Sequence, residues 1–181
     1  NNLYIAGDSG VILKTTDGGA TAWSLKSTGT TANLNEVAFP TDATTGWAIG
    51  AAGTILKTID SGTNWTSQSA NVRDTSGNPL NISSYTLNAI DGIGGDNNTH
   101  WVVGSSGLIL KTTNGGTTWN QQTSGTTDEL TSISNVDSSI LWVTARTDKL
   151  FQTTNGGTTW TNRGSTGGYG FFSSALIPST T

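Results

Sequence analysis

The stretch Lys111-Thr112-Thr113-Asn114-Gly115-Gly116-Thr117-Thr118-Trp119 decides the fold, because close copies of it recur along the chain. The other copies are Lys14–Trp23, Lys57–Trp65 and Gln152–Trp160. Ten residues before the Lys or Gln of each copy stands a second aromatic residue: Tyr4, Trp47, Trp101 or Trp142. All seven tryptophans fall at these two repeat positions. We therefore interpret the tryptophans as framework residues.

Each repeat predicts four short strands separated by glycine-containing turns. Runs of four to six β-forming residues bounded by Gly, Asn and Asp are typical of antiparallel hairpins. No window carries the apolar period of 3.6 residues that indicates a helix. Successive aromatic positions, from Tyr4 to Trp142, are 43, 54 and 41 residues apart, which is typical of β-propeller blades. We predict an all-β fold, a β-propeller of four-stranded antiparallel blades in a single domain over 1–181.

The repeats fall at about 1–33, 34–86, 87–129 and 130–171, and the longest carries an insertion at about 70–84. The closing run 172–178 is similar to Leu34–Pro40, including the final Pro. We expect this run to add the innermost strand to the blade of the N-terminal strands, which would close a four-bladed ring and hide the sheet edges. Two alternatives stay open: a piece of a larger ring, and a subunit that donates its last strand to a neighbour.

The repeated turn has a local physical logic. A short carboxylate or amide accepts hydrogen bonds from backbone N–H groups ahead of it, and the glycine adopts positive φ. The tryptophan then covers the turn. We assign this structural role to Asp17, Asp60, Asn114 and Asn155 and to the tryptophans that follow them: Trp23, Trp65, Trp119 and Trp160. The first copy has one extra residue, which predicts a distorted turn.

The turn motif Thr-x-(Asp/Asn)-x-Gly-x-(Thr/Asn)-Trp resembles the Asp-box of bacterial sialidase-type (BNR) repeats. Together with the segments Trp-x-x-Gly and Gly-x-Ile-Leu-Lys-Thr, it is most similar to the propeller family of photosystem II stability and assembly factors. The resemblance covers nearly the whole chain. It implies a propeller whose surface holds protein partners, in a family that also occurs as modules of bacterial surface and secreted proteins.

Composition excludes several function classes. Charged residues make up 11% of the chain and the net charge is -4, without the basic stripe that nucleic-acid binding needs. The lack of Cys excludes disulfides and thiol catalysis. No apolar run reaches the ~20 residues of a membrane-spanning helix. The abundance of Thr, Ser, Asn and Gly leads us to expect an extracellular or cell-surface protein.

The residues of a sialidase or another glycosidase are scarce. A sialidase needs convergent arginines, acid–base carboxylates and a Tyr nucleophile. The chain has three arginines and two glutamates, Glu36 and Glu129. A lone histidine, His100, cannot build a His-rich metal site or a catalytic triad. We predict no enzymatic activity and no cofactor, with a glycosidase as the least favoured alternative.

For three other features of the sequence we favour a structural role over a ligand-binding role. The loop Asp91–Asn98 is rich in oxygen ligands but lacks the spacing of a calcium loop, so we predict a polar loop and no metal site. Lys14, Lys57 and Lys111 recur with Gln152 in the fourth place, which indicates a shared position over the neighbouring blade rather than a ring of ligand-binding lysines. Sugar stacking is the alternative role of the tryptophans.

We expect the loops opposite the Asp-box turns to carry all three arginines of the chain. The second-to-third turn of a blade and the link to the next blade lie on the same face of an antiparallel blade. We place Arg73 in the insertion, Arg146 in such a turn and Arg163 in the closing link. The hypothesis is a recognition face for a protein or glycan partner, made of Arg73, Asp74, Arg146, Asp148, Lys149, Arg163 and Asp8. Scattered solubilising charges are the alternative.

The predicted function is therefore non-enzymatic recognition or scaffolding by a secreted or cell-surface propeller. A structural subunit of an extracellular filament, surface layer or phage fibre, self-assembling through the terminal strand, is the alternative.

Overall fold

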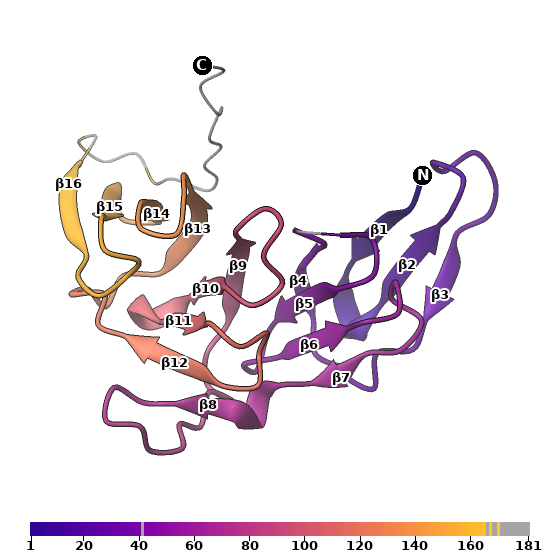
Figure 1. Cartoon of the computed structure of the whole chain (residues 1–181), viewed down its shortest axis with the longest axis horizontal. Helices are drawn as coiled ribbons and strands as arrows, with labels where there is room; N and C mark the ends of the chain where they lie inside the picture. Colours follow the sequence, from indigo (N-terminus) through magenta and orange to yellow (C-terminus); the bar gives the residue numbers. More distant parts are fainter. Residues whose placement is uncertain (41, 166, 168–169, 171–181) are drawn as a thin grey trace.

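The computed structural model of the chain describes residues 1–40, 42–165, 167 and 170, and their regular structure is almost entirely β (Figure 1). The first sheet contains β1 (Leu3–Ala6), β2 (Ile12–Thr15) and β3 (Ser24–Lys26). The second contains β4 (Leu34–Ala38), β5 (Gly46–Gly50), β6 (Ile55–Thr58) and β7 (Thr66–Ser67). The third contains β9 (Leu87–Gly92), β10 (His100–Gly104), β11 (Ile109–Thr112) and β12 (Trp119–Gln122), with β8 (Val72–Arg73) at its edge. The fourth contains β13 (Leu130–Asn135), β14 (Leu141–Ala145), β15 (Lys149–Thr153) and β16 (Thr161–Ser165).

Figure 1 shows the four sheets following one another along an arc, with the first sheet (indigo) and the fourth (orange to yellow) at its two ends. The strands β4, β9 and β13 lie innermost in the second, third and fourth sheets, and each pairs antiparallel with the strand that follows it. The predicted closing strand at 172–178 lies outside the described residues, so ring closure stays a prediction.

The insertion differs from the sequence-based expectation of a simple link. Its residues Val72 and Arg73 form β8, which pairs parallel with Trp119 and Asn120 of β12. The third sheet thereby gains a fifth strand, in the order β8-β12-β11-β10-β9. Val72 is fully buried, so an apolar side chain fixes the insertion to the sheet edge. Three 3-10 turns complete the described elements: η1 (Asp8–Gly10), η2 (Ser69–Asn71) and η3 (Ser105–Gly107).

The hydrophobic cores lie between successive sheets. We call the side of a sheet that faces the next sheet along the chain its downstream face, and the opposite side its upstream face. On the downstream face of the second sheet, Trp47 and Ile55 pack against Val102 and Trp119 of the third. The Trp47 and Trp119 rings meet edge to face with centroids 5.3 Å apart. Because each sheet supplies half of each core, the blades stabilise one another.

A lysine on each of the first three sheets also joins it to the next sheet. Lys14 Nζ donates to Ser61 O at 2.7 Å, and Lys57 Nζ donates to Gly115 O at 2.7 Å. Lys111 Nζ repeats the contact with Gly156 O at 2.9 Å. Each ammonium lies about 5 Å above the aromatic ring of its own sheet, a cation–π geometry. The predicted position of these lysines over the neighbouring blade is therefore confirmed.

The Asp-box turns follow the predicted logic. Asp60 Oδ1 accepts a hydrogen bond from Asn64 N at 2.9 Å. This hydrogen bond is the largest of several effects that together lower the pKa of Asp60 to about 2. Asn114 Oδ1 accepts from Thr118 N at the same distance, so the amide replaces the carboxylate. In the first turn Asp17 instead accepts from Gly19 N and Ala20 N, and Trp23 is only half-buried. The predicted distortion of the first turn is confirmed.

Candidate recognition groove

An open groove of about 670 Å³ lies where the insertion, the third sheet and the fourth sheet meet. The link from β12 to β13 forms most of it, the η3 turn and Thr75 of the insertion contribute on the third sheet, and Lys149 contributes from the fourth. The groove is lined by Thr75, Ser106, Gly107, Gln121, Gln122, Thr123, Ser124, Gly125, Thr126, Thr127, Asp128 and Lys149. Hydroxyl, amide and glycine residues dominate this lining, so the groove is polar and bears few charges.

The floor of the groove is fixed by the close approach of the link to the η3 turn. Gly107 has φ 68°, and a Cβ there would come closer to the carbonyl of Thr126 than real Cβ atoms do. Gly107 N donates to Asp128 O at 2.8 Å, and the buried hydroxyl of Ser124 donates to Thr126 O at 3.1 Å. Only glycine can adopt this φ and also lie this close to a backbone carbonyl. Gly107 therefore fixes the path of the link.

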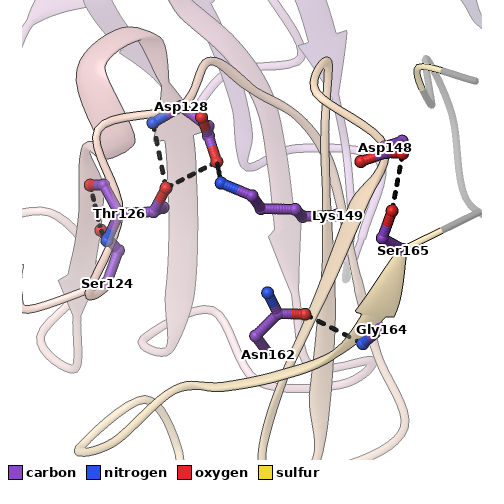
Figure 2. Close-up of polar contacts among 8 residues, drawn as sticks. All are labelled: Ser124, Thr126, Asp128, Asp148, Lys149, Asn162, Gly164 and Ser165. Atoms are coloured by element: carbon purple, nitrogen blue, oxygen red, sulfur yellow. Dashed lines mark hydrogen bonds and ion pairs between the residues drawn. The ribbon is translucent and has the colours of Figure 1, made fainter. Parts of the chain in front are cut away.

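One charged pair lies across the groove. Figure 2 shows Lys149 extending from the fourth sheet to Asp128, whose carboxylate also accepts from the Thr126 hydroxyl. The Lys149 Nζ–Asp128 Oδ2 distance is 2.6 Å. The hydrogen bond from Lys149, followed by that from Thr126, lowers the pKa of Asp128. Beside this pair Arg146 Nε contacts Glu129 Oε2 at 2.7 Å. Both cations therefore have a carboxylate partner, and the local charges largely cancel.

The second-to-third turn of the fourth sheet departs from the glycine pattern of the other three. The first three sheets place Gly10, Gly53 and Gly107 at positive φ, each against a backbone carbonyl of the link to the next sheet. The fourth sheet places Asp148 there, with φ 65°. Its carboxylate accepts from the Ser165 hydroxyl at 2.6 Å (Figure 2). An aspartate is among the few residues that tolerate this conformation, and its side chain now ties the turn to β16.

The structure brings part of the predicted recognition face together. Lys149 lines the groove, Arg146 and Asp148 lie in the adjoining turn, and Asp74 precedes the lining residue Thr75. Asp74 fixes its own loop by accepting from Ser76 N and Asn78 N at 2.8 and 2.9 Å. The guanidinium of Arg73 donates to Val72 O at 3.0 Å beside that loop.

Two predicted residues lie elsewhere. Asp8 belongs to η1 of the first sheet, at the other end of the arc (Figure 1). The placement of Arg163 in the closing link was wrong, because Thr161–Ser165 continue the fourth sheet as β16. Arg163 Nε donates to Gln152 Oε1 at 2.8 Å, within that sheet. Short polar residues gave no strand signal there, and pairing with β15 decides the structure.

Sequence reasoning missed Asp128 as a member of this site, and it used Glu129 only in counting acids. A signal was present: the pair Asp128-Glu129 precedes the innermost strand of the fourth repeat, where the second and third repeats have Ala32-Asn33 and Tyr85-Thr86. The same repeat has Asp148 in place of the glycine of its second-to-third turn, with the charged residues Arg146 and Lys149 close by. The pair Asp128-Glu129 and the second-to-third turn thus depart from the repeat pattern together, and this coincidence predicts that the two segments are in contact.

The other residues considered in the sequence, His100 and Asp91, hold the sheets together. His100 is fully buried against Trp47, with ring centroids 5.3 Å apart, and burial lowers its pKa. Asp91 accepts from Gly92 N and Asn135 N, each at 2.8 Å, which joins β9 to β13. Within the described ranges no three His, Cys, Asp or Glu side chains are grouped as a metal ion would require. No described helix is long and apolar enough to cross a membrane.

The family model of the photosynthesis system II assembly factor YCF48 matches residues 20–165. The chain belongs to the YCF48 family. This membership confirms the resemblance stated from the Asp-box turns. No curated protein matches the chain.

Solved structures of larger propellers share the fold. YCF48 bound to D1 peptide is 24% identical, with a TM-score of 0.58 over 72% of this chain and 39% of that one. YCF48 from Cyanidioschyzon merolae is 21% identical, with a TM-score of 0.60 over 75% and 41%. The GH74 enzyme of Niastella koreensis is 21% identical, with a TM-score of 0.68 over 90% and 27%. The chain spans about two fifths of the YCF48 structures, and these matches confirm the predicted propeller architecture.

Proposed function

We propose that the chain is a non-enzymatic recognition scaffold that binds an extended segment of a protein partner in the groove between the third and fourth sheets. The observation that carries the proposal is the groove itself: a fixed polar channel at the point where the fourth repeat departs from the others. A solved member of the same family is described as bound to a D1 peptide, which supports a peptide as the kind of ligand.

The chemistry of the groove suits a peptide main chain. A peptide presents one N–H and one C=O per residue, and both need partners when they leave water. Gln121 offers a carboxamide, Thr123 and Thr127 offer exposed hydroxyls, and the link offers backbone groups. The Lys149–Asp128 pair adds one donor and one acceptor without a strong net field. We expect recognition of an uncharged segment, with little dependence of affinity on salt concentration.

A glycan partner is less well supported. Sugar sites rely on exposed aromatic faces, and the residues that line this groove include none. The tryptophans of the second and third sheets are taken up by the inter-sheet cores instead. Catalysis is also disfavoured at this place, because Asp128 and Glu129 are each engaged by a cation rather than poised as an acid–base pair.

The experiment is a binding screen against an array of short peptides that tile the proteins of the native host, followed by fluorescence polarisation of the best peptide. Thr127→Arg fills the groove with an exposed, long cation. Thr31→Arg is the matched control, since Thr31 occupies the corresponding place in the link of the first sheet. We expect Thr127→Arg to weaken binding about tenfold or more, and Thr31→Arg to leave it unchanged. Equal effects of both variants, or no peptide bound at all, would contradict the proposal.

We also propose that the protein works outside the cell or at its surface. The support is the composition, which is rich in Thr, Ser, Asn and Gly and has charged residues at only 11%. Fractionation of the native host with an antibody against the chain tests this. Recovery of the protein only in the cytoplasmic fraction would refute it.

A further inference from the structure

Three segments of the chain have the sequence Asn-x-Ser/Thr, with x other than proline, which is the acceptor sequence for N-linked glycosylation. They are Asn64–Thr66, Asn81–Ser83 and Asn97–Thr99. Sugar transfer uses two groups of this sequence: the amide nitrogen of the asparagine, which forms the new bond, and the hydroxyl two residues later, which the transferase recognises. All three asparagines are exposed, so exposure alone does not distinguish the segments.

The fold occupies both groups of the first segment. Asn64 Nδ2 donates to Asp60 Oδ2 at 2.7 Å, and the Thr66 hydroxyl donates to Lys57 O at 3.2 Å. The first of these bonds lies within an Asp-box turn, and the second joins β7 to β6. Because its acceptor is a carboxylate, the bond from the Asn64 amide is stronger than one between neutral groups. A transferase would have to break it before the nitrogen could react.

The third segment is engaged in the same way by different neighbours. Asn97 Nδ2 donates to Asp42 Oδ2 at 2.7 Å, which ties the connection before β10 to the connection before β5. The Thr99 hydroxyl is hydrogen-bonded to Asp96 and contributes to the lowered pKa of that carboxyl. Both groups that a transferase needs are therefore held by aspartates.

The second segment, in the insertion, presents both groups. Asn81 Oδ1 accepts from Ser83 N at 2.9 Å, so the side-chain oxygen holds the turn. Within the part of the chain that the structure describes, neither Asn81 Nδ2 nor the Ser83 hydroxyl has a hydrogen-bond partner. Ile82 between them is 2% exposed and its carbonyl lies against Gly53, which fixes the segment to the second sheet. Asn81 and Ser83 on either side of this anchor are exposed.

The surroundings of Asn81 leave room for a sugar. An open hollow of about 420 Å³ adjoins it, lined by Ala52, Ser69, Ala70, Pro79, Leu80, Asn81, Ile82 and Ser83. Alanine, proline, leucine and isoleucine supply most of this lining. The C–H face of a sugar ring bonded to Asn81 can cover Pro79 and Leu80, which removes apolar surface from water.

We propose that Asn81 is an acceptor site for N-linked glycosylation of the folded chain, with a nucleotide-activated hexose as the donor. The Asn81 amide nitrogen bonds to the anomeric carbon of the hexose while the bond from that carbon to the diphosphate oxygen breaks. The nucleoside diphosphate leaves with the bonding electrons, and the amide gives one proton to a base of the transferase. Asn64 and Asn97 stay unmodified in the folded chain. This site is independent of the peptide groove.

The test is transfer of glucose from UDP-glucose to the purified, folded chain by a soluble N-glycosyltransferase, measured by intact mass and by mapping of the modified residues. We expect one hexose per chain, at Asn81, and none in Asn81→Gln or Ser83→Ala. The matched control Asn97→Gln should gain the same mass as the wild type. Occupancy of Asn81 should exceed that of Asn64 about tenfold or more, because the Asn64 amide must first leave a carboxylate. Circular dichroism verifies that each variant is folded.

A tryptic digest tests whether the fold makes the selection. Trypsin cuts after Lys57, Arg73 and Lys111, so Asn64 falls in the peptide 58–73 and the other two asparagines fall in 74–111. The turns are lost in these peptides, and we expect all three asparagines to accept hexose. Three results would overturn the proposal: no transfer to Asn81 in the folded chain, folded-chain transfer to Asn64 or Asn97 as fast as to Asn81, or a digest in which Asn81 is again the one acceptor.

Discussion

Replacing Gly107 by alanine measures how strongly one glycine fixes the floor of the groove. Two costs add up at this position. The left-handed φ of 68° costs an L-residue about 1–2 kcal/mol. The new Cβ also overlaps the carbonyl of Thr126, and moving a packed segment to make room costs about 1–3 kcal/mol. We therefore expect Gly107→Ala to lower the free energy of unfolding by about 2–5 kcal/mol.

The matched control is Gly125→Ala in the same link. Gly125 also has a positive φ, 75°, but its added Cβ would meet no atom within 4 Å. It should therefore lose only the conformational cost, about 1–2 kcal/mol. Urea unfolding followed by tryptophan fluorescence gives both values, provided that the slope with denaturant is unchanged. Equal destabilisation by the two variants would refute the reasoning, since it would mean that the Thr126 carbonyl exerts no steric constraint.

Three further predictions concern the framework. Lys57→Met should lower the free energy of unfolding by about 1.5–3 kcal/mol, because it removes the charged hydrogen bond to Gly115 O, whereas Lys26→Met should have little effect in the same urea titration. Asn114→Asp should be nearly neutral and Asn114→Ala should cost about 1 kcal/mol, since a carboxylate performs this role at Asp60; equal losses in thermal unfolding would contradict it. Burial lowers the pKa of His100, so the unfolded chain takes up a proton below about pH 6.5 before the folded chain does, and stability should fall as the pH decreases from there toward the folded pKa. His100→Gln should flatten that part of a pH series of urea titrations, and an unchanged slope would disprove the assignment.

The local pattern of the sequence was sufficient for the blades and their turns. Each Asp-box contains its own donors, acceptors and glycine within a few residues, so its geometry follows from short-range chemistry. The recurring Lys57 and Lys111 could be placed over the next blade because repetition implies the same neighbour each time. The burial of Trp47, Trp101 and Trp119 follows from the same regularity.

The candidate site was predictable only in part, because it is made where the repeat breaks. Lys149 was chosen as a loop residue, but its partner Asp128 lies in a different connection, 21 residues away. Arg163 was expected in a link and lies in a strand, since pairing with β15 outweighs the weak β-propensity of Thr161–Ser165. The parallel pairing of β8 with β12 likewise depends on where the insertion returns to the sheet.

The sequence by itself determined the all-β blades, their Asp-box turns and the framework role of the tryptophans, because these depend on contacts within one repeat or between identical repeats. Tertiary structure alone decided the pairing of Lys149 with Asp128, the groove around Gly107 and the accessibility of the Asn81 amide. Those features depend on the path of individual links and on which side chains meet across them. Neither quantity is encoded in a local pattern, since the same Asn-x-Ser/Thr sequence binds a carboxylate at Asn64 and Asn97 and none at Asn81.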